Sequence, residues 1–137
     1  MNNIKRVLFI CKHNRFRSKV AEALFNKYNS NKNYIACSGG LLPGKYPLNK
    51  EQVKVAREFG IKLVGKPKPI STDLLSKTGL IIIVADNVKE EIFEAEKYGK
   101  EIITWKIRDD YTGESKNIRK IIANIEKKLK NLLEHLK

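Results

Sequence analysis

The chain has 137 residues, and its 28 Lys and Arg against 15 Asp and Glu give a formal net charge of +13. This length predicts one domain with its own core, and 42% hydrophobic with 31% charged residues excludes disordered and fibrous classes. The longest apolar run, Leu80–Ala85, is far shorter than the roughly 20 residues of a membrane-spanning helix. Two cysteines without a CxxC pair argue against a disulfide framework or a structural zinc site. The start of the chain shows no signal-peptide pattern, so we expect a cytoplasmic protein without a membrane partner.

Strand-like and helix-like segments alternate along the chain. A continuous apolar run typical of a buried strand covers residues 7–10, and further strands are predicted over 34–38, 80–85 and 102–105,. Amphipathic spacing, capping residues and terminal glycines predict helices over 18–28, 49–59, a short stretch capped by 71–73, 86 or 87 to 98, and a long stretch striped from Ile118 to Leu136. This order predicts an α/β fold, a four-stranded parallel sheet with helices on both faces. Ligands of such sheets bind beyond the carboxyl ends of the strands, where Cys11 and the loop after Trp105 lie.

Positive charge gathers around one of the two cysteines. Residues 1–21 hold six basic residues and no acid: Lys5, Arg6, Lys12, Arg15, Arg17 and Lys19. Such a cluster predicts an anionic partner, either a phosphate group or a nucleic acid.

The segment Cys11–Ser18 joins the first predicted strand to the first predicted helix, and we expect it to be the single phosphate-binding loop. Backbone N–H groups in such a loop converge on one point, with the helix dipole behind them. Arg17 adds a planar pair of donors for two phosphate oxygens. The same field should lower the pKa of Cys11, and a thiolate beside a bound phosphate is a nucleophile for phosphorus.

The sequence Cys-Lys-His-Asn-Arg-Phe-Arg-Ser over residues 11–18 resembles the active-site loop of the low-molecular-weight protein tyrosine phosphatases and their arsenate reductase relatives. The pattern of that family is Cys-x-Gly-Asn-x-Cys-Arg-Ser, and Cys11, Asn14, Arg17 and Ser18 match it. The resemblance covers nearly the whole chain through further segments: 37–40, 59–61, 81–86 and 105–111. It implies a single domain of this type over residues 1–137 and a phosphomonoester hydrolase, above all a protein tyrosine phosphatase, without cofactor or metal.

The resemblance also implies roles for individual residues. Cys11 would be the nucleophile that forms a phosphocysteine, Arg17 would bind the phosphoryl oxygens, and Asp109 would be the general acid and then the base. The substrate would be a phosphotyrosine-containing protein or a small aryl phosphate, and phosphate the product. Further residues would contact substrate or shape the loop: Lys12, His13, Asn14, Arg15, Phe16, Ser18 and Tyr111.

Several of these residues also have structural interpretations. Ser18 would donate a hydrogen bond to Cys11, cap the first helix, or do both. Asn14 would hold the loop in shape or serve as an ordinary left-handed turn residue. Tyr111 would stack on an aryl ring or be a half-exposed loop residue, and Asp109, without the resemblance, reads as a turn residue.

Three residues depart from the family pattern. His13 stands at a glycine position, which puts the close loop geometry in doubt, and Phe16 replaces the second loop cysteine. Asp110 replaces the proline after the catalytic Asp109. We expect this change to loosen the loop and to raise one apparent pKa of the carboxylate pair. Either carboxylate could be the acid, and alignment on Trp105 favours Asp109.

The sequence leaves alternatives open. Arg15, at the variable loop position, is a cation that should disfavour phosphoarginine and favour phosphotyrosine. An arsenate reductase needs a relay of further cysteines, and only Cys37, which we expect to be a packed core thiol, is available. A non-catalytic basic module that binds nucleic acid is the third hypothesis, although no nucleic-acid motif is present. Asp86 is expected to cap a helix, and His135 to be solvated.

Overall fold

The computed structural model describes residues 4–45, 47–93 and 100–136. Its elements run in the order β1 (Lys5–Cys11), α1 (Arg17–Tyr28), β2 (Tyr34–Gly40), α2 (Lys50–Glu58), α3 (Thr72–Lys77), β3 (Leu80–Val84), the 3₁₀ helix η1 (Glu90–Phe93), β4 (Glu101–Trp105) and α5 (Ser115–His135). The four predicted strands and the helices that follow the first, second and fourth of them are thus confirmed, with ends shifted by a few residues.

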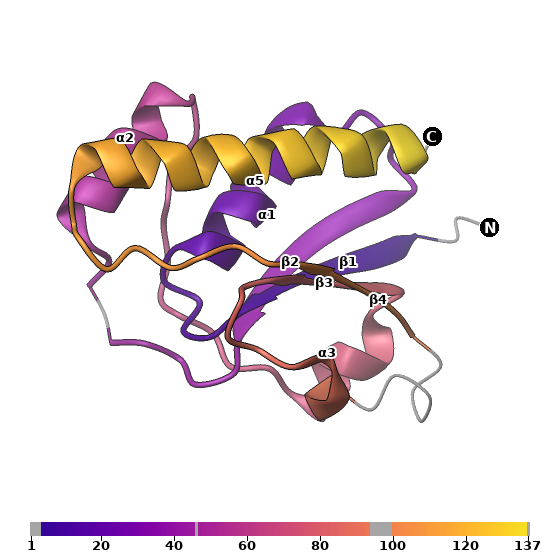
Figure 1. The fold of residues 1–137 in the computed structure, drawn as a ribbon. Helices are drawn as coiled ribbons and strands as arrows, with labels where there is room; N and C mark the ends of the chain where they lie inside the picture. The colour runs from indigo at the N-terminus through magenta and orange to yellow at the C-terminus, as the bar shows by residue number, and fades with distance from the viewer. Residues whose placement is uncertain (1–3, 46, 94–99, 137) are drawn as a thin grey trace.

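The strands form one sheet in the order β2-β1-β3-β4, and every neighbouring pair is parallel. Helices cover both faces, with α1, α2 and α5 on one side and α3 on the other (Figure 1). The predicted α/β class and parallel sheet are therefore confirmed. Because the strands are parallel, their carboxyl ends meet at one edge, which brings the loops after β1 and β4 together.

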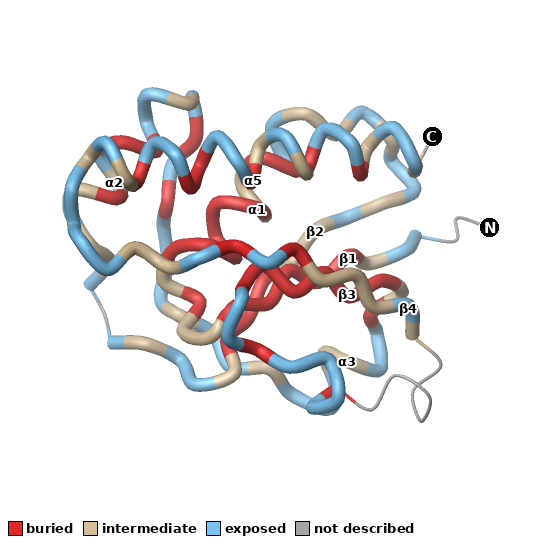
Figure 2. The backbone as a smooth tube through the Cα atoms, in the orientation of Figure 1, coloured by how far each residue is buried: buried red, intermediate tan, exposed pale blue. Residues whose placement is uncertain are grey.

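Alternate residues of the buried strands supply two separate cores. Val7 and Phe9 of β1 face the core under α1, α2 and α5, whereas Leu8 and Ile10 face the smaller core beside α3. This alternation follows from the two-residue period of a strand. Figure 2 shows β1 and β3 as the most deeply buried strands, so the end of β1, Cys11, is fixed from both sides.

Helix ends follow from local chemistry. Asn49 caps α2 by accepting a hydrogen bond from the Gln52 amide, and Ser71 caps α3 through the Leu74 amide, as short polar side chains do. Gly60 follows the C-cap of α2 with φ of 74°, the left-handed conformation expected there. The long helix α5 buries the predicted apolar stripe, from Ile118 to Leu132.

One predicted helix is wrong over its described part. Residues 86–88 form a bend and η1 is a 3₁₀ helix, so Asp86 caps no α-helix. Instead its Oδ1 lies 3.6 Å from Arg17 Nη1, because the chain after β3 turns across the end of the sheet. Residues 94–98 of that prediction lie outside the described residues. Within the described ranges, no helix has the length and apolar character needed to cross a bilayer.

Candidate active site

The sulfur of Cys11 lies at the bottom of the loop between β1 and α1. Cys11 is buried, and its Sγ accepts a hydrogen bond from the Asn14 amide at 3.3 Å. Ser18 Oγ lies 2.9 Å from the same sulfur. Donors on a sulfur stabilise its negative charge, and α1 directs its positive N-terminus at the same loop.

Asn14 organises the loop from beneath. It has φ of 53° and is fully buried. Its Nδ2 donates to Ser18 Oγ at 2.8 Å and to Ser38 Oγ at 3.0 Å, while its Oδ1 accepts from the Lys68 amide at 2.8 Å. Asn14 is therefore both the left-handed residue and the residue that holds the loop. Because Ser18 Oγ accepts from Asn14, its own hydrogen is free for Cys11.

Ser18 does not cap α1. The helix begins at Arg17, its N-cap is Phe16, and no side chain caps it. Within the described part of the chain, the amides of His13, Arg15 and Phe16 donate no backbone hydrogen bond. These N–H groups, at the N-terminal end of α1, are donors that a phosphate-binding loop would use for an anion.

The loop rests against the chain that follows β2. Leu41 and Leu42 amides donate to the carbonyls of Cys11 and Lys12, and Nδ1 of His13 donates to Leu42 O at 2.8 Å. Gly40 makes this approach possible, because a Cβ there would lie 2.7 Å from the backbone carbon of His13. The doubt about His13 at a glycine position is resolved, since the positive φ falls on Asn14 and not on His13.

A buried lysine fixes the segment that supports Asn14. Lys19 is 5% exposed, and its Nζ donates to Val64 O at 3.1 Å and Lys66 O at 3.3 Å. Burial, and secondarily the charge of Lys68, lowers the pKa of Lys19. From the sequence, Lys19 is only a member of the basic cluster, because its neighbours in the chain give no sign that it is buried.

Arg17 connects the loop after β1 to the segments that follow β3 and β4. Its side chain is buried, Nη1 donates to Ile107 O at 2.9 Å, and Nη2 donates to Asn87 Oδ1 at 3.2 Å. Nη2 also lies 3.5 Å from Asp109 Oδ2. The predicted phosphate ligand and the predicted acid are thus adjacent, although 92 positions separate them in the sequence.

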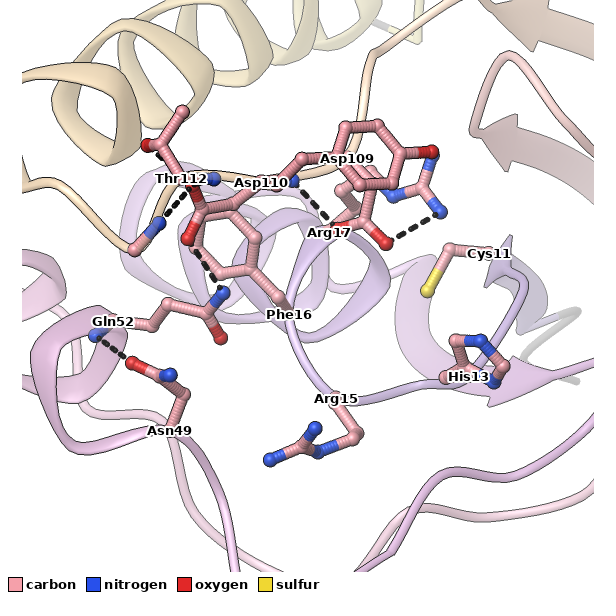
Figure 3. A pocket seen from close by; sticks show the side chains of 12 residues that line it. Cys11, His13, Arg15, Phe16, Arg17, Asn49, Gln52, Asp109, Asp110 and Thr112 are labelled. Atoms are coloured by element: carbon pink, nitrogen blue, oxygen red, sulfur yellow. Dashed lines mark hydrogen bonds and ion pairs between the residues drawn. The ribbon is translucent and has the colours of Figure 1, made fainter.

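Above Cys11 opens a pocket of about 310 Å³. Its walls come from the loop after β1, the start of α2 and the loop after β4, and Figure 3 shows Cys11, Arg17 and Asp109 toward one side with Asn49 and Gln52 toward the other. The lining residues are Cys11, His13, Arg15, Phe16, Arg17, Asn49, Gln52 and Asp109 to Gly113.

The carboxylate pair differs from expectation. Asp109 Oδ1 accepts from the Asp110 amide at 2.8 Å, while Asp110 Oδ1 accepts from Asn117 Nδ2 at 2.9 Å and from the Gly113 amide at 3.0 Å. Burial raises the pKa of Asp110, but hydrogen bonds from Asn117, Gly113, Gln52 and Thr112 outweigh it and leave that pKa below its ordinary 3.8. The expected rise is wrong for Asp110. The expected loosening of the loop stays a prediction, and the hydrogen bonds on the Asp110 carboxylate argue against it.

The pocket brings together most of the residues predicted for the site. Asn14 and Ser18 lie beneath it, Tyr111 is at its mouth with 68% of its surface exposed, and Lys12 is not among the lining residues. Sequence reasoning missed a group that tertiary structure brings in: Asn49, Gln52, Asn87, Thr112 and Gly113. The sequence predicted that a helix begins near Asn49, but no local signal tells which loop a helix start will face.

Two remaining predictions concern residues away from the pocket. Cys37 is partly buried and donates to Val7 O at 3.7 Å, and burial above all raises its pKa to about 11. His135 is exposed, as predicted. Among the residues with described positions, no group of three or more His, Cys, Asp or Glu is arranged to hold a metal ion.

Comparison with known proteins identifies relatives over the full fold. The family model described as low molecular weight phosphotyrosine protein phosphatase matches residues 6–137. Among solved structures, a low molecular weight protein tyrosine phosphatase from T. tengcongensis is 26% identical, with a TM-score of 0.83 over 96% of this chain and 99% of that one.

Relatives with other activities share the fold. An arsenate reductase from Archaeoglobus fulgidus is 25% identical, with a TM-score of 0.73 over 93% of this chain and 98% of that one. The YwlE arginine phosphatase from Geobacillus stearothermophilus is 21% identical, with a TM-score of 0.83 over 96% of this chain and 92% of that one. At that identity the last likeness concerns the fold alone.

Proposed function

Because the chain belongs to the low molecular weight phosphotyrosine protein phosphatase family, we propose that it hydrolyses phosphomonoesters, above all aryl phosphates such as phosphotyrosine. The observation that carries the proposal is the surroundings of one sulfur. Cys11 Sγ takes a hydrogen bond from the Asn14 amide and lies 2.9 Å from Ser18 Oγ, in a pocket that it shares with Arg17 and Asp109.

Cys11 would act as the nucleophile. Its thiolate attacks phosphorus, so that a sulfur–phosphorus bond forms while the bond to the leaving oxygen breaks. Arg17 is already fixed through Ile107 O and Asn87 Oδ1. It can turn further N–H groups toward the phosphoryl oxygens and stabilise the charge that gathers on them in the transition state.

Asp109 would move the proton in both steps. It protonates the leaving oxygen first, then takes a proton from the water that attacks phosphocysteine, which releases phosphate and the free thiolate. Asp110 is the weaker candidate for this role, because four hydrogen bonds on Oδ1 and one on Oδ2 already occupy its carboxylate. Those bonds favour the ionised form, which has no proton to give.

Substrate preference would depend on the walls of the pocket. Phe16 and Tyr111 offer aromatic surface to an aryl group,. Arg15 lines the same pocket, and its Nη2 donates to Pro47 O at 3.0 Å. The positive charge of Arg15 would repel the guanidinium group of a phosphoarginine substrate. Phosphotyrosine is therefore favoured over phosphoarginine, and Arg15→Gln should narrow the difference in kcat/KM between the two.

The first experiment is hydrolysis of p-nitrophenyl phosphate in the presence of a metal chelator. We expect turnover, competition by vanadate, and a loss of about 10⁴-fold or more in Cys11→Ser. Cys37→Ser is the matched control, because it removes the other thiol at a site outside the pocket, and it should keep wild-type activity. Turnover that survives in Cys11→Ser would sink the proposal.

Arsenate reduction on the same scaffold lacks an internal thiol relay. Cys37 is the second cysteine of the chain, and the register pairs Cys11 with Gly40, three residues farther along β2. That offset is about 10 Å, whereas a disulfide needs Cα atoms within roughly 7 Å. With its raised pKa of about 11, Cys37 is also a poor nucleophile at neutral pH.

Two measurements separate the alternatives from a phosphatase. A reductase would consume thioredoxin or glutaredoxin equivalents when arsenate is added, and we expect none. A non-catalytic basic module would bind single or double strands with strong salt dependence and no hydrolysis. Either result, together with absent phosphate release, would replace the proposed function.

A further inference from the structure

Asp110 lies where three parts of the molecule meet. Its Oδ1 accepts from Thr112 N and Thr112 Oγ1, both at 3.2 Å, from Gly113 N at 3.0 Å and from Asn117 Nδ2 at 2.9 Å. Its Oδ2 accepts from Gln52 Nε2 at 3.3 Å. One carboxylate therefore joins the first turn of α2, the first turn of α5 and the loop that carries Asp109.

The same residue touches Asp109 directly. The Asp110 amide donates to Asp109 Oδ1 at 2.8 Å, which leaves Oδ2 directed at Arg17, 3.5 Å from Nη2. Figure 3 shows this chain of contacts from Asn49 through Gln52 and Asp110 to Asp109 and Arg17. If the carboxylate of Asp109 were turned away, proton transfer would slow, because a general acid acts only within hydrogen-bond distance of the oxygen that it protonates.

We propose that Asp110 is a positioning residue, which holds the carboxylate of Asp109 over the leaving oxygen by clamping the loop between α2 and α5. This inference rests on the proposed function, because it needs Asp109 to protonate a leaving group. Where the family pattern has a proline, whose ring stiffens the backbone, this chain has Asp110. Its charge-assisted hydrogen bonds, which are stronger than neutral ones, hold the loop instead. The N-terminus of α5, whose N-cap makes no side-chain hydrogen bond, adds a favourable field for this carboxylate.

The dependence of kcat/KM on the leaving group tests the clamp. The leaving oxygen of phenyl phosphate needs a proton, whereas dinitrophenolate leaves as the anion and needs none. For Asp110→Ala we expect kcat/KM to fall about tenfold with phenyl phosphate and less than about twofold with dinitrophenyl phosphate. Asp109→Asn should show the same split with a larger loss, of about 10²-fold.

A second variant separates the positioning of Asp109 from the effect of the negative charge of Asp110 on substrate binding. Asp110 lines the pocket, so its removal also takes a negative charge away from the dianionic substrate and should lower KM. Asn117→Ala leaves that charge in place and removes one hydrogen bond from outside the pocket lining. Its kcat/KM should also fall more with phenyl phosphate than with dinitrophenyl phosphate, with a loss of about threefold for phenyl phosphate.

The matched control breaks another link between the same two helices. Glu58 of α2 pairs with Arg119 of α5 through Nε at 2.8 Å and Nη2 at 3.0 Å, on the exposed surface. Glu58→Gln weakens this link without touching the loop, so its kcat/KM should stay at wild-type values for both substrates.

The outcomes distinguish this inference from the proposed function. If wild-type protein hydrolyses neither phosphate, the proposed function fails, and the positioning role fails with it. If wild-type protein is active and Asp110→Ala loses equally with both leaving groups, or not at all, the positioning role is wrong and the phosphatase proposal stands. A split in Asp110→Ala and Asn117→Ala, absent in Glu58→Gln, supports it.

Discussion

The two loops that form the pocket are held in opposite ways. The loop after β1 and the start of α1 lie against the cores, and Asn14, Arg17 and Ser18 there are buried and hydrogen-bonded. The loop after β4 is exposed at Tyr111 through Glu114, and its fixed point is the carboxylate of Asp110. The loop with the proposed nucleophile Cys11 (the nucleophile loop) therefore depends on core packing. The loop with the proposed acid Asp109 (the acid loop) depends on a few polar contacts near water.

This difference separates two kinds of damage. Steric changes under the first loop should cost both stability and activity, because packed interiors resist rearrangement. Changes in the second loop should alter proton transfer with little effect on unfolding, because exposed segments relax at low cost. Arg17 belongs to both, since it starts α1 and donates to Ile107 O.

Among variants that test this comparison of the two loops, the largest effect is expected at Arg17. Arg17→Lys keeps the charge but loses the planar pair of donors, and kcat/KM should fall about 10³-fold. The measurement is steady-state hydrolysis of p-nitrophenyl phosphate, with circular dichroism to verify the fold. A loss under tenfold would mean that Arg17 serves the two loops structurally and does not bind the phosphoryl group.

An intermediate effect should distinguish two glycines, Gly40 beneath the loop after β1 and Gly113 within the loop after β4. Gly40→Ala puts a Cβ 2.7 Å from His13 backbone, and we expect a loss of about 2 kcal/mol in unfolding free energy with roughly tenfold lower kcat/KM. Gly113 has φ of 71°, and a Cβ added there would meet no other atom within 4 Å. Gly113→Ala should cost about 1 kcal/mol of backbone strain and leave the nucleophile loop intact.

Chemical denaturation and kcat/KM for dinitrophenyl phosphate provide the test of this pair. That substrate reports the nucleophile loop alone, because its leaving group needs no acid. Equal losses of kcat/KM in both alanine variants would contradict the contrast between the loops.

The smallest effect concerns acid stability. The pKa of Asp110 is below 3.8 in the folded protein, so its stabilisation is fully present above that value and is lost as pH falls through the folded pKa. The melting temperature of Asp110→Asn should therefore lie slightly below that of wild type at neutral pH, and the difference should vanish at the acid end. Asp73→Asn, in an exposed pair with Lys77, is the control. A difference that grows on acidification would reverse the assigned sign.

Local patterns were sufficient for much of the fold. The apolar run of β1, the stripe of α5 and the cap at Ser71 are properties of neighbouring residues, and each produced the expected element. The region after β3 was harder to predict, because Asp86 and Asn87 resemble a helix start but face Arg17 from another element. The side-chain oxygens of Asp86 and Asn87 could either cap a helix or bind a distant guanidinium, and the sequence does not distinguish these two roles.

The sequence by itself determined the α/β order, the position of Cys11 at the end of a buried strand, and the match of Cys11, Asn14, Arg17 and Ser18 to one family. Only the tertiary structure decided that Lys19 is buried, that α2 contributes Asn49 and Gln52 to the pocket, and that Asp110 fixes its loop. The reason is physical: periodicity and capping act over a few residues, whereas burial and hydrogen-bond partners depend on which distant segments the folded sheet brings together.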